Sequence, residues 1–173
     1  MDVIQTPEMS VDVVAAVDGA LPAELGGPGS FDFILCTEVL EHVADWAAAF
    51  ANLATLLRPG GRLLVTCPHF YRLHEEPYDF WRPTLHAIGH HARINGLAVA
   101  KQEMVGDGWD VLGTLLASCP AVPHRPGLRF RLGSKIVNAA RRVLFALLRR
   151  GLPQKLARLP GTYLSNVVLL EKK

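Results

Sequence analysis

The sequence predicts an α/β fold with a mostly parallel sheet, and three observations support this. A near-continuous apolar run, Phe33 to Cys36, is typical of a strand buried on both faces of such a sheet. A second apolar run, Arg62 to Cys67, follows it. Between the runs, apolar residues recur at helical spacings of three and four: Trp46, Phe50, Leu53 and Leu57. A strand, a helix and a strand in this order form a parallel pair with a right-handed crossover.

The helix between these strands has signals at both ends. Asp45 can cap its first turn, and Arg58-Pro59-Gly60-Gly61 ends it, because Pro cannot continue a helix and Gly accepts the left-handed terminal conformation. Polar residues follow the first strand at once: Thr37, Glu38, Glu41 and His42. Ligands of open α/β sheets bind outside the carboxyl ends of the strands, so we expect a ligand site here.

Length and charge indicate one globular domain, residues 1–173, with an uneven charge distribution. Half of the 173 residues are hydrophobic and 20% are charged, which permits a sizeable core. Residues 1–123 carry 6 Lys or Arg and 15 Asp or Glu, a net charge of −9. Residues 124–173 carry 12 and 1, a net charge of +11. This asymmetry suggests that the C-terminal part meets an anionic surface or substrate.

The cysteines and the N-terminus indicate the cellular compartment in which the protein is expected. Cys36, Cys67 and Cys119 are far apart, and the first two fall in predicted strands. We interpret them as small core residues in a reducing cytoplasm rather than as disulfide partners or metal ligands. The N-terminus lacks the basic start and apolar run of a signal peptide, so we expect a cytoplasmic protein.

A loop rich in aromatic and charged residues, Cys67 to Thr84, follows the second strand. Such loops usually carry function when a rigid scaffold positions them. His74 and His69 are candidates for a general base, because an imidazole titrates near neutral pH. The structural alternative is that His74, Asp79 and Arg82 form a hydrogen-bonded clasp that fixes the loop. The two interpretations are compatible.

Thr84 can cap the next helix, which ends before Gly96. Its predicted inner face holds Leu85, Ile88 and Ala92. His86 and His90 lie one turn apart, a spacing that can bind a metal. No third ligand is evident in the sequence, so we predict a solvated helix face and no metal site.

Two further strands, Leu97 to Glu103 and Tyr163 to Leu170, enclose a long connection, Met104 to Thr162. This connection is predicted to be a helical, basic insertion with helices at Trp109 to Ser118 and Lys135 to Arg150. Neither helix has the ~18 consecutive apolar residues that cross a bilayer. The second separates apolar from basic side chains, which is typical of an interfacial helix. One interpretation is peripheral contact with the inner face of a membrane through residues 135–150. The alternative is an ordinary amphipathic helix that packs on the sheet and leaves its basic face solvated.

The motifs around the first strand-helix-strand unit resemble those of a known family. They are Phe31-Asp32, Thr37-Glu38-Val39-Leu40-Glu41-His42-Val43 and Leu57-Arg58-Pro59-Gly60-Gly61. In order and spacing they are similar to the fourth-strand and fifth-strand motifs of class I S-adenosylmethionine-dependent methyltransferases, in the type 11, ubiquinone-biosynthesis-like branch. The resemblance covers roughly Asp2 to Thr84. It implies a Rossmann-like sheet whose last strand lies antiparallel between the fifth and sixth. It also implies methyl transfer from S-adenosylmethionine to a small-molecule or lipid-linked acceptor.

The resemblance also implies residues that bind the cofactor. Met1 to Ile4 resembles the end of the family's second strand, which makes Asp2 the candidate for the ribose hydroxyls. Val11 to Val17 resembles the third strand, so Asp18 would accept from the adenine amine and Leu21 would pack on the ring. A frayed terminus is the alternative for Asp2, and a plain turn is the alternative for Asp18. The other candidates lie at the fourth-strand motif: Cys36, Thr37, Glu38 and His42.

In the same branch, a run of His, acid, Pro, aromatic, Asp, aromatic and Arg after the fifth strand resembles the wall of the substrate pocket. The corresponding candidates for substrate binding are Tyr71, Glu75, Asp79 and Arg82. The sequence does not choose between oxygen, nitrogen and carbon acceptors.

The N-terminal region departs from the family. Class I methyltransferases have a first strand followed by a Gly-rich turn that approaches the cofactor's methionine part. Gly26-Gly27-Pro28-Gly29 matches this turn in composition only, because a strand and not a helix follows it, so we interpret it as an exposed loop. We therefore expect a sheet without its first strand and helix. The Phe33 to Cys36 strand would then have an open edge that can lead to a homo-oligomer.

Three functions remain open from the sequence. An S-adenosylmethionine-dependent methyltransferase is preferred. A truncated, non-catalytic fragment that acts as a binding module, or is inert, is the alternative. Nucleic-acid modification is disfavoured, because aromatic stacking residues are scarce between Lys135 and Arg158.

Overall fold

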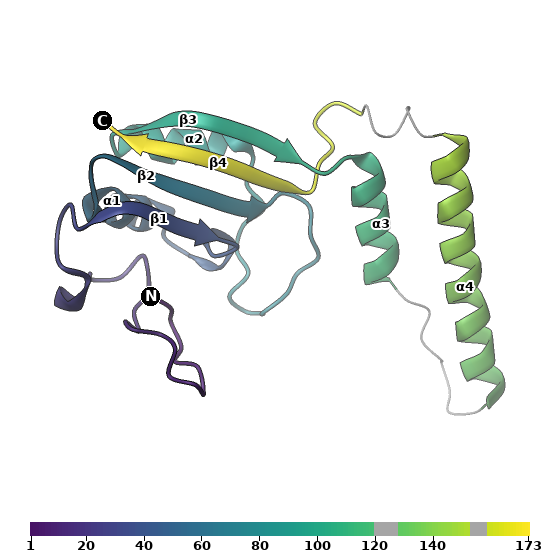
Figure 1. Cartoon of the computed structure of the whole chain (residues 1–173). Helices are drawn as coiled ribbons and strands as arrows, with labels where there is room; N and C mark the ends of the chain where they lie inside the picture. Colours follow the sequence, from purple (N-terminus) through teal and green to yellow (C-terminus); the bar gives the residue numbers. More distant parts are fainter. Residues whose placement is uncertain (120–127, 153–158) are drawn as a thin grey trace. The chain divides into compact units, whose positions relative to one another are not determined.

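The computed structural model describes residues 1–119, 128–152 and 159–173 and divides into two compact units (Figure 1). The first unit comprises Met1–His69, Leu73–Met104 and Ser165–Lys173. The second comprises Phe70–Arg72 and Val105–Leu164.

The first unit is built on a four-stranded sheet with the order β1-β2-β4-β3 (Figure 1). The strands are β1 (Phe31–Thr37), β2 (Leu57–Pro68), β3 (Leu97–Val105) and β4 (Ser165–Lys172). β1 pairs with β2 in parallel, whereas β4 pairs with β2 in antiparallel fashion. This arrangement confirms the predicted Rossmann-like sheet, with an antiparallel last strand inserted between two earlier ones.

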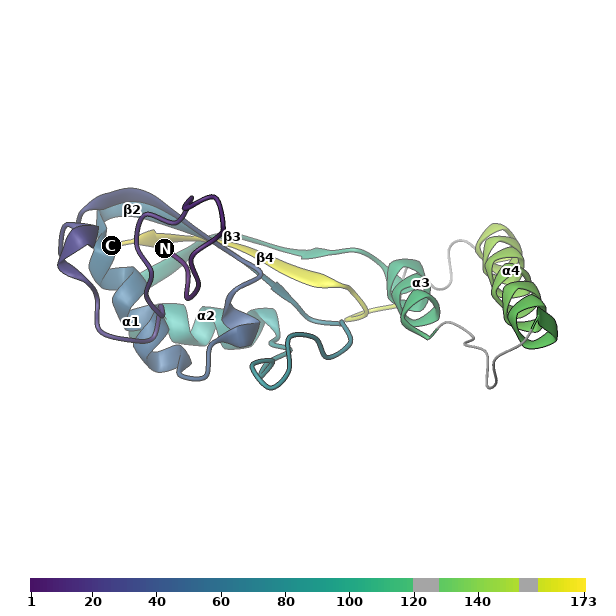
Figure 2. The ribbon, with the colours of Figure 1, turned by 90° about the horizontal axis from the view of Figure 1, so that it is seen from below.

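Two helices, α1 (Trp46–Leu56) and α2 (Leu85–Ile94), pack on one face of this sheet (Figure 2). Their predicted caps are confirmed. The Asp45 side chain accepts from the backbone N–H of Ala48 at 3.0 Å, and Thr84 accepts from that of Ala87 at 3.3 Å. The core lies between the helices and the sheet and includes Phe50, Leu53, Leu63, Val65, Ile88 and Val168.

The prediction that the Phe33 to Cys36 strand is buried on both faces was wrong, because one face of β1 is exposed. Cys36 is buried, but Phe33 and Leu35 are 48% and 63% exposed. The reason is that α1 and α2 both lie on the other face of the sheet (Figure 2). β1 is also an end strand of the described sheet, so its outer edge has no strand partner within that sheet.

The prediction of a strand at Val11 to Val17 was also wrong. This segment makes only an isolated parallel bridge, between Asp2 and Val14. Two backbone hydrogen bonds support it: Asp2 donates to Val13 at 3.1 Å and Ala15 donates to Asp2 at 2.8 Å. A two-stranded ribbon without further strands is only marginally stable, which explains why the pairing does not extend.

The second unit contains the helices α3 (Gly108–Ser118) and α4 (Leu128–Gly151). α3 agrees with the prediction, and a capping box between Asp107 and Asp110 begins it. α4 is longer than predicted because the apolar and basic pattern already begins at Leu128. No helix among the described residues has the length and apolar character needed to cross a bilayer.

Candidate functional site

The chain turns sharply at the carboxyl end of β1. Glu38, the first residue after the strand, has a φ of 52°, a left-handed conformation that is uncommon outside glycine. Its backbone N–H donates to the Thr66 carbonyl at 3.0 Å, and its carboxylate accepts from the Thr66 hydroxyl at 2.8 Å. Glu38 is thereby held at the edge where β1 and β2 end. The 3₁₀ helix η2 (Leu40–His42) follows.

Glu41 of η2 is a fully buried acid. Its Oε2 accepts from the Cys67 thiol at 3.6 Å, whereas its Oε1 has no hydrogen-bond partner in the described structure. Burial raises the pKa of the Glu41 carboxyl, and the neighbouring charge of Glu38 raises it further. Glu41 can therefore hold a proton at a higher pH than an exposed acid.

Two histidine rings meet beside this acid. The Nδ1 of His42 lies 2.8 Å from the carbonyl oxygen of Tyr78 and must donate to it, so a neutral His42 carries its lone pair on Nε2. This Nε2 lies 3.9 Å from both Glu41 Oε1 and Glu75 Oε2. The ring of His74 contacts that of His42 edge to face, with 4.7 Å between the centroids.

A clasp around Asp79 fixes His74, as the structural alternative predicted. The Asp79 side chain is 1% exposed and accepts from the backbone N–H of His74 at 2.8 Å. Its two oxygens also accept from Arg82 at 2.6 and 2.8 Å. The Arg82 hydrogen bonds hold the pKa of Asp79 well below its usual range, against the opposing effect of burial.

Glu41, His42 and His74 thus form one cluster, in which one ligand-type atom from each residue lies within 4.8 Å of the others. Such a set can pass a proton between its members. Two imidazoles and a carboxylate are also the groups best placed, among the described residues, to hold a divalent cation. Our prediction of no metal site stays a prediction.

The other predicted loop residues lie outside this cluster. The Nδ1 of His69 is 2.9 Å from the Pro83 carbonyl oxygen, so this ring links the two ends of the loop. Tyr71 belongs to the second unit. Glu75 is exposed, and its Oε2 lies 3.9 Å from His42 Nε2.

Two polar residues of this region were given no role from the sequence. Glu41 was named among the polar residues where a ligand site was expected, but no function was assigned to it, and its position next to His42 was the available signal. Asn166 is fully buried in β4, where its amide donates to the carbonyls of Cys67, at 3.1 Å, and Pro83, at 2.9 Å. The available signal was the Ser165-Asn166 pair in the otherwise apolar run Tyr163 to Leu170.

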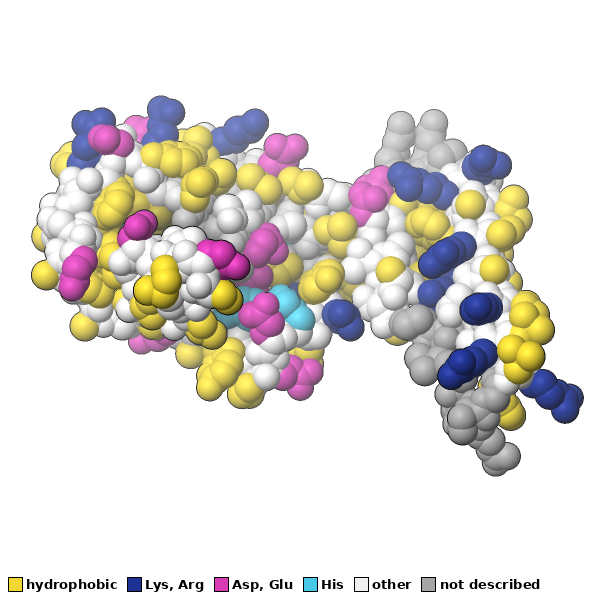
Figure 3. Space-filling view, turned by 60° about the horizontal axis from the view of Figure 1, so that its bottom comes forward, with side chains coloured by type: hydrophobic (Ala, Val, Ile, Leu, Met, Phe, Trp, Pro, Cys, Tyr) yellow, Lys and Arg dark blue, Asp and Glu magenta, His cyan; other side chains and the backbone are white. Residues whose placement is uncertain are grey.

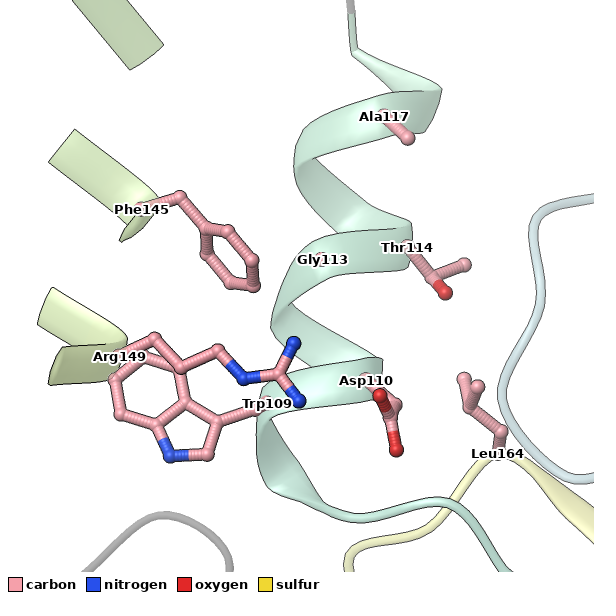
Figure 4. Close-up of a pocket in the computed structure, with 8 residues that line it drawn as sticks. All are labelled: Trp109, Asp110, Gly113, Thr114, Ala117, Phe145, Arg149 and Leu164. Atoms are coloured by element: carbon pink, nitrogen blue, oxygen red, sulfur yellow. The ribbon is translucent and has the colours of Figure 1, made fainter. Parts of the chain in front are cut away.

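The second unit holds a pocket of about 350 Å³ between α3 and α4 (Figure 4). Its lining residues are Trp109, Asp110, Gly113, Thr114, Ala117, Phe145, Arg149 and Leu164. None of them was predicted as a site residue, and the acid-histidine cluster belongs to the other unit.

Comparison with known proteins identifies the family. A family model described as a methyltransferase domain matches residues 5–102, more than half of the chain. The chain belongs to this methyltransferase-domain family.

The curated relatives of this methyltransferase domain include ubiquinone biosynthesis O-methyltransferases. That of Albidiferax ferrireducens is 38% identical over 77 residues, which cover 44% of this chain and 25% of the relative. That of Xanthomonas euvesicatoria is 51% identical over 39 residues, which cover 22% and 16%. The chain thus spans about a quarter, or less, of the length of these curated relatives.

Solved structures support the fold. A SAM-dependent methyltransferase from Archaeoglobus fulgidus superposes with a TM-score of 0.52 and 10% identity, covering 92% of this chain and 66% of the other. The [4+2]-cyclase SpnF superposes with a TM-score of 0.51 and 14% identity, covering 92% and 54%. Because one of these proteins is described as a cyclase, the fold alone does not determine the activity.

In a methyltransferase domain, the predicted cofactor residues would lie near the carboxyl end of β1. The Asp18 carboxylate accepts from the backbone N–H of Asp45 at 3.3 Å, beside the start of α1. Asn52 fixes the same turn by donating to the Val17 and Gly19 carbonyls at 2.9 and 2.7 Å. An acid is therefore held near η2, which suits a donor such as an adenine amine.

The remaining cofactor candidates differ in what they can contribute. Thr37 is exposed and Leu21 half-buried, so both can touch a ligand. Burial raises the pKa of the Cys36 thiol to about 12, so this side chain can only pack. The Asp2 carboxylate accepts from the backbone N–H of Val3 at 2.6 Å.

The Gly26–Gly29 loop lies at the other end of β1. The backbone N–H of Gly29 donates to the carbonyl of Thr55, in the last turn of α1, at 2.9 Å. This position is next to the amino end of β1, whereas Glu38 follows its carboxyl end. The acid near η2 therefore fits the adenine part of S-adenosylmethionine, but this glycine loop does not fit its methionine part.

Proposed function

We propose that this domain transfers a methyl group from S-adenosylmethionine to a hydroxyl of a small-molecule or lipid-linked acceptor. The observation that carries the proposal is the cluster of Glu41, His42 and His74, because a hydroxyl must lose a proton when it is methylated. The O-methyltransferase relatives support the choice of a hydroxyl over a nitrogen or carbon acceptor.

His74 is the general base in this proposal. The Asp79 carboxylate lies 3.2 Å from His74 Nδ1, which favours the proton on Nδ1 and the basic lone pair on Nε2. Asp79 therefore acts as a positioning residue, as do the Arg82 hydrogen bonds that hold it. The raised pKa of Glu41 lets this carboxyl share the proton released by the acceptor.

The cofactor would be held by residues at the carboxyl end of β1 and in the preceding turns. S-adenosylmethionine supplies an electrophilic methyl group when it is bound. Asp18 would accept from its adenine amine, Asp2 would bind its ribose hydroxyls, and Leu21 would pack on the ring. Thr37, Glu38 and His42 would line the side that faces the acceptor, and Cys36 would pack behind them.

Of the predicted substrate residues in the first unit, Glu75 is the proposed acceptor-side residue, because Asp79 and Arg82 are bound to each other and position His74. Glu75 is exposed and has a φ of 55°, an uncommon conformation for a residue other than glycine, and its carboxylate faces solvent. His69 and Tyr71 were predicted for the base and the substrate wall. The tether of His69 to Pro83 favours a supporting role for it.

Methyl transfer can be tested with a radiolabelled methyl donor at about 1 mM and a set of catechol and phenol acceptors, with and without a lipid tail. We expect His74→Ala to lower kcat at least about a hundredfold, the usual range for a general base. The matched control is His86→Ala, an exposed histidine on α2. Full activity of His74→Ala would contradict the proposed role of His74. No transfer by the unchanged protein to any acceptor would contradict the function.

A non-catalytic binding module is the second candidate. The position of the Gly26–Gly29 loop next to the amino end of β1 favours it, because this loop leads into a strand and does not open a helix at the carboxyl end of β1. Acceptor binding without methyl transfer, in the same assay series, would support this alternative.

A further inference from the structure

α4 carries a long apolar surface that is exposed in the described structure. None of its residues is buried. Nine of its large apolar side chains are between 38% and 84% exposed. Ile136, Val143 and Leu147 have spacings of seven and four, so they form one row on a single side of the helix. Exposed apolar surface of this extent usually marks an interaction site.

The row does not include the side of α4 that packs on α3. Phe145 contacts Trp109 edge to face, with 5.9 Å between the ring centroids, and lies over Gly113 (Figure 4). The Arg141 guanidinium donates to the Cys119 carbonyl. The half-buried residues of α4 are Ser134, Asn138, Arg141 and Phe145, and they define this inner side. The apolar row is therefore available to a partner outside the second unit.

The charge of α4 indicates what kind of partner this is. The helix carries seven Lys or Arg residues and no Asp or Glu. Figure 3 shows these basic side chains along α4, next to hydrophobic ones. A surface that offers both apolar and anionic groups would satisfy the two features together, and a bilayer with acidic headgroups is such a surface.

We propose that α4 docks in the plane of an anionic lipid bilayer. Its Ile136 to Leu147 row enters the boundary between headgroups and acyl chains, and its basic side chains bind lipid phosphates. The helix does not span the membrane, since charged residues are distributed along its whole length. This surface lies outside the methyl-transfer site and goes beyond the proposed function.

Two other occupants fit less well. A second copy of α4 would bring fourteen like charges together, twice the seven of one helix, without compensating acids. A nucleic acid would use the basic side chains but not the aliphatic row, and it would find few aromatic stacking residues on this helix.

The test is co-sedimentation of the full chain with vesicles of neutral phosphatidylcholine, or with a quarter of anionic phosphatidylglycerol, at low and high salt. We expect at least tenfold stronger partition onto the anionic vesicles at low salt, and weaker partition at high salt. Equal partition onto both kinds of vesicle would overturn the proposal without any variant. Because the assay needs no cofactor or acceptor, its failure is distinct from failure of the proposed function.

Two variants locate the surface. Lys135→Glu/Arg142→Glu/Arg150→Glu reverses three exposed charges that make no contact described above, and we expect it to lose at least tenfold in partition. The matched control reverses three exposed charges elsewhere, Arg93→Glu/Lys101→Glu/Lys173→Glu, and should retain binding. Equal losses in both triple variants would overturn the assignment to α4.

The second variant, Ile136→Asn/Leu147→Asn, removes part of the apolar row. We expect it to reduce the fraction that stays bound at high salt, where apolar insertion dominates. Circular dichroism of both α4 variants should show unchanged helix content. Tighter binding of a single-stranded oligonucleotide than of anionic vesicles, or a lipid-free dimer abolished by Ile136→Asn/Leu147→Asn, would replace the bilayer as the partner.

Discussion

The carboxylate of Asp79 lies 2.8 Å from the backbone nitrogen of His74 and 3.2 Å from its ring Nδ1. One buried acid thus sets both the backbone position and the ring orientation of the proposed base. Arg82 occupies both oxygens of the same carboxylate. A change at Asp79 should therefore affect the loop and the base together.

Asp79→Asn should lower the free energy of unfolding by about 2 kcal/mol, because it weakens charge-assisted hydrogen bonds from Arg82 and His74. Urea unfolding at pH 7 measures this. The control is Glu76→Gln, which neutralises an exposed acid of the same loop. The pKa of Asp79 is lowered on folding, so its stabilising effect is complete above about pH 4 and is lost as the pH falls through the lowered value. A stability difference that changes between pH 6 and 8 would contradict this.

Glu41→Gln should show the opposite pH dependence. Burial raises the pKa of Glu41 on folding, so stability is lost as the pH rises from about 4.3, the usual value, through the raised one. The glutamine variant does not titrate, so its stability relative to the unchanged protein should increase over this range. Thermal unfolding from pH 4 to 8 gives the comparison. A constant difference across the range would show that the carboxyl ionises normally in the folded state.

The thiols should differ in reactivity. Burial raises the pKa of Cys36 to about 12 and raises that of Cys67 further, whereas Cys119 is exposed. A thiol reagent at pH 8 should modify one cysteine in the folded protein and three in denaturant. Cys119→Ser should then leave the folded protein unmodified. Modification of two or three thiols without denaturant would mean that the first unit opens readily.

S-adenosylmethionine should bind this chain weakly, with a Kd of about 1 mM, equivalent to about −4 kcal/mol. The physical reason is that the Gly26–Gly29 loop lies next to the amino end of β1, so it cannot present backbone N–H groups at the other end. Isothermal titration calorimetry of the purified chain measures the Kd. A micromolar value would show that other groups replace the glycine turn.

The open edge of β1 should promote self-association. Phe33 and Leu35 are exposed beside an edge that has no strand partner in the described sheet. We expect sedimentation velocity to show an oligomer that increases with concentration and decreases in Leu35→Lys. Leu73→Lys, which adds the same charge at a 64% exposed loop leucine, is the control. A monomer at all concentrations would contradict this prediction.

Local signals predicted the helices and strands well, because caps and apolar periodicity act within one element. Asp45 and Thr84 cap the helices as expected, and the last strand lies between the two predicted neighbours. The exposure of Leu35 and the single bridge at Val14 depend on neighbouring elements, which no local pattern specifies.

The site was harder to predict for the same reason. From the sequence, His42 was predicted to bind the cofactor and His74 to act as a general base, and nothing local joins two residues with 31 others between them in the chain. Only the fold brings their rings to a centroid distance of 4.7 Å. The burial of Glu41 between β1 and the loop is likewise a tertiary effect.

The hydrogen bonds of the Asn166 amide affect how the sequence of this domain can change in evolution. It donates to the carbonyls of Cys67 and Pro83, and His69 approaches the same Pro83 oxygen. The segment that leaves β2 and the segment that enters α2 are thus joined at their bases. Exchanges at exposed positions between those two points, such as Leu73, can leave β2 and α2 joined. Descendants of this sequence could therefore acquire new acceptors through such exchanges while His74, Asp79 and Arg82 keep their hydrogen bonds.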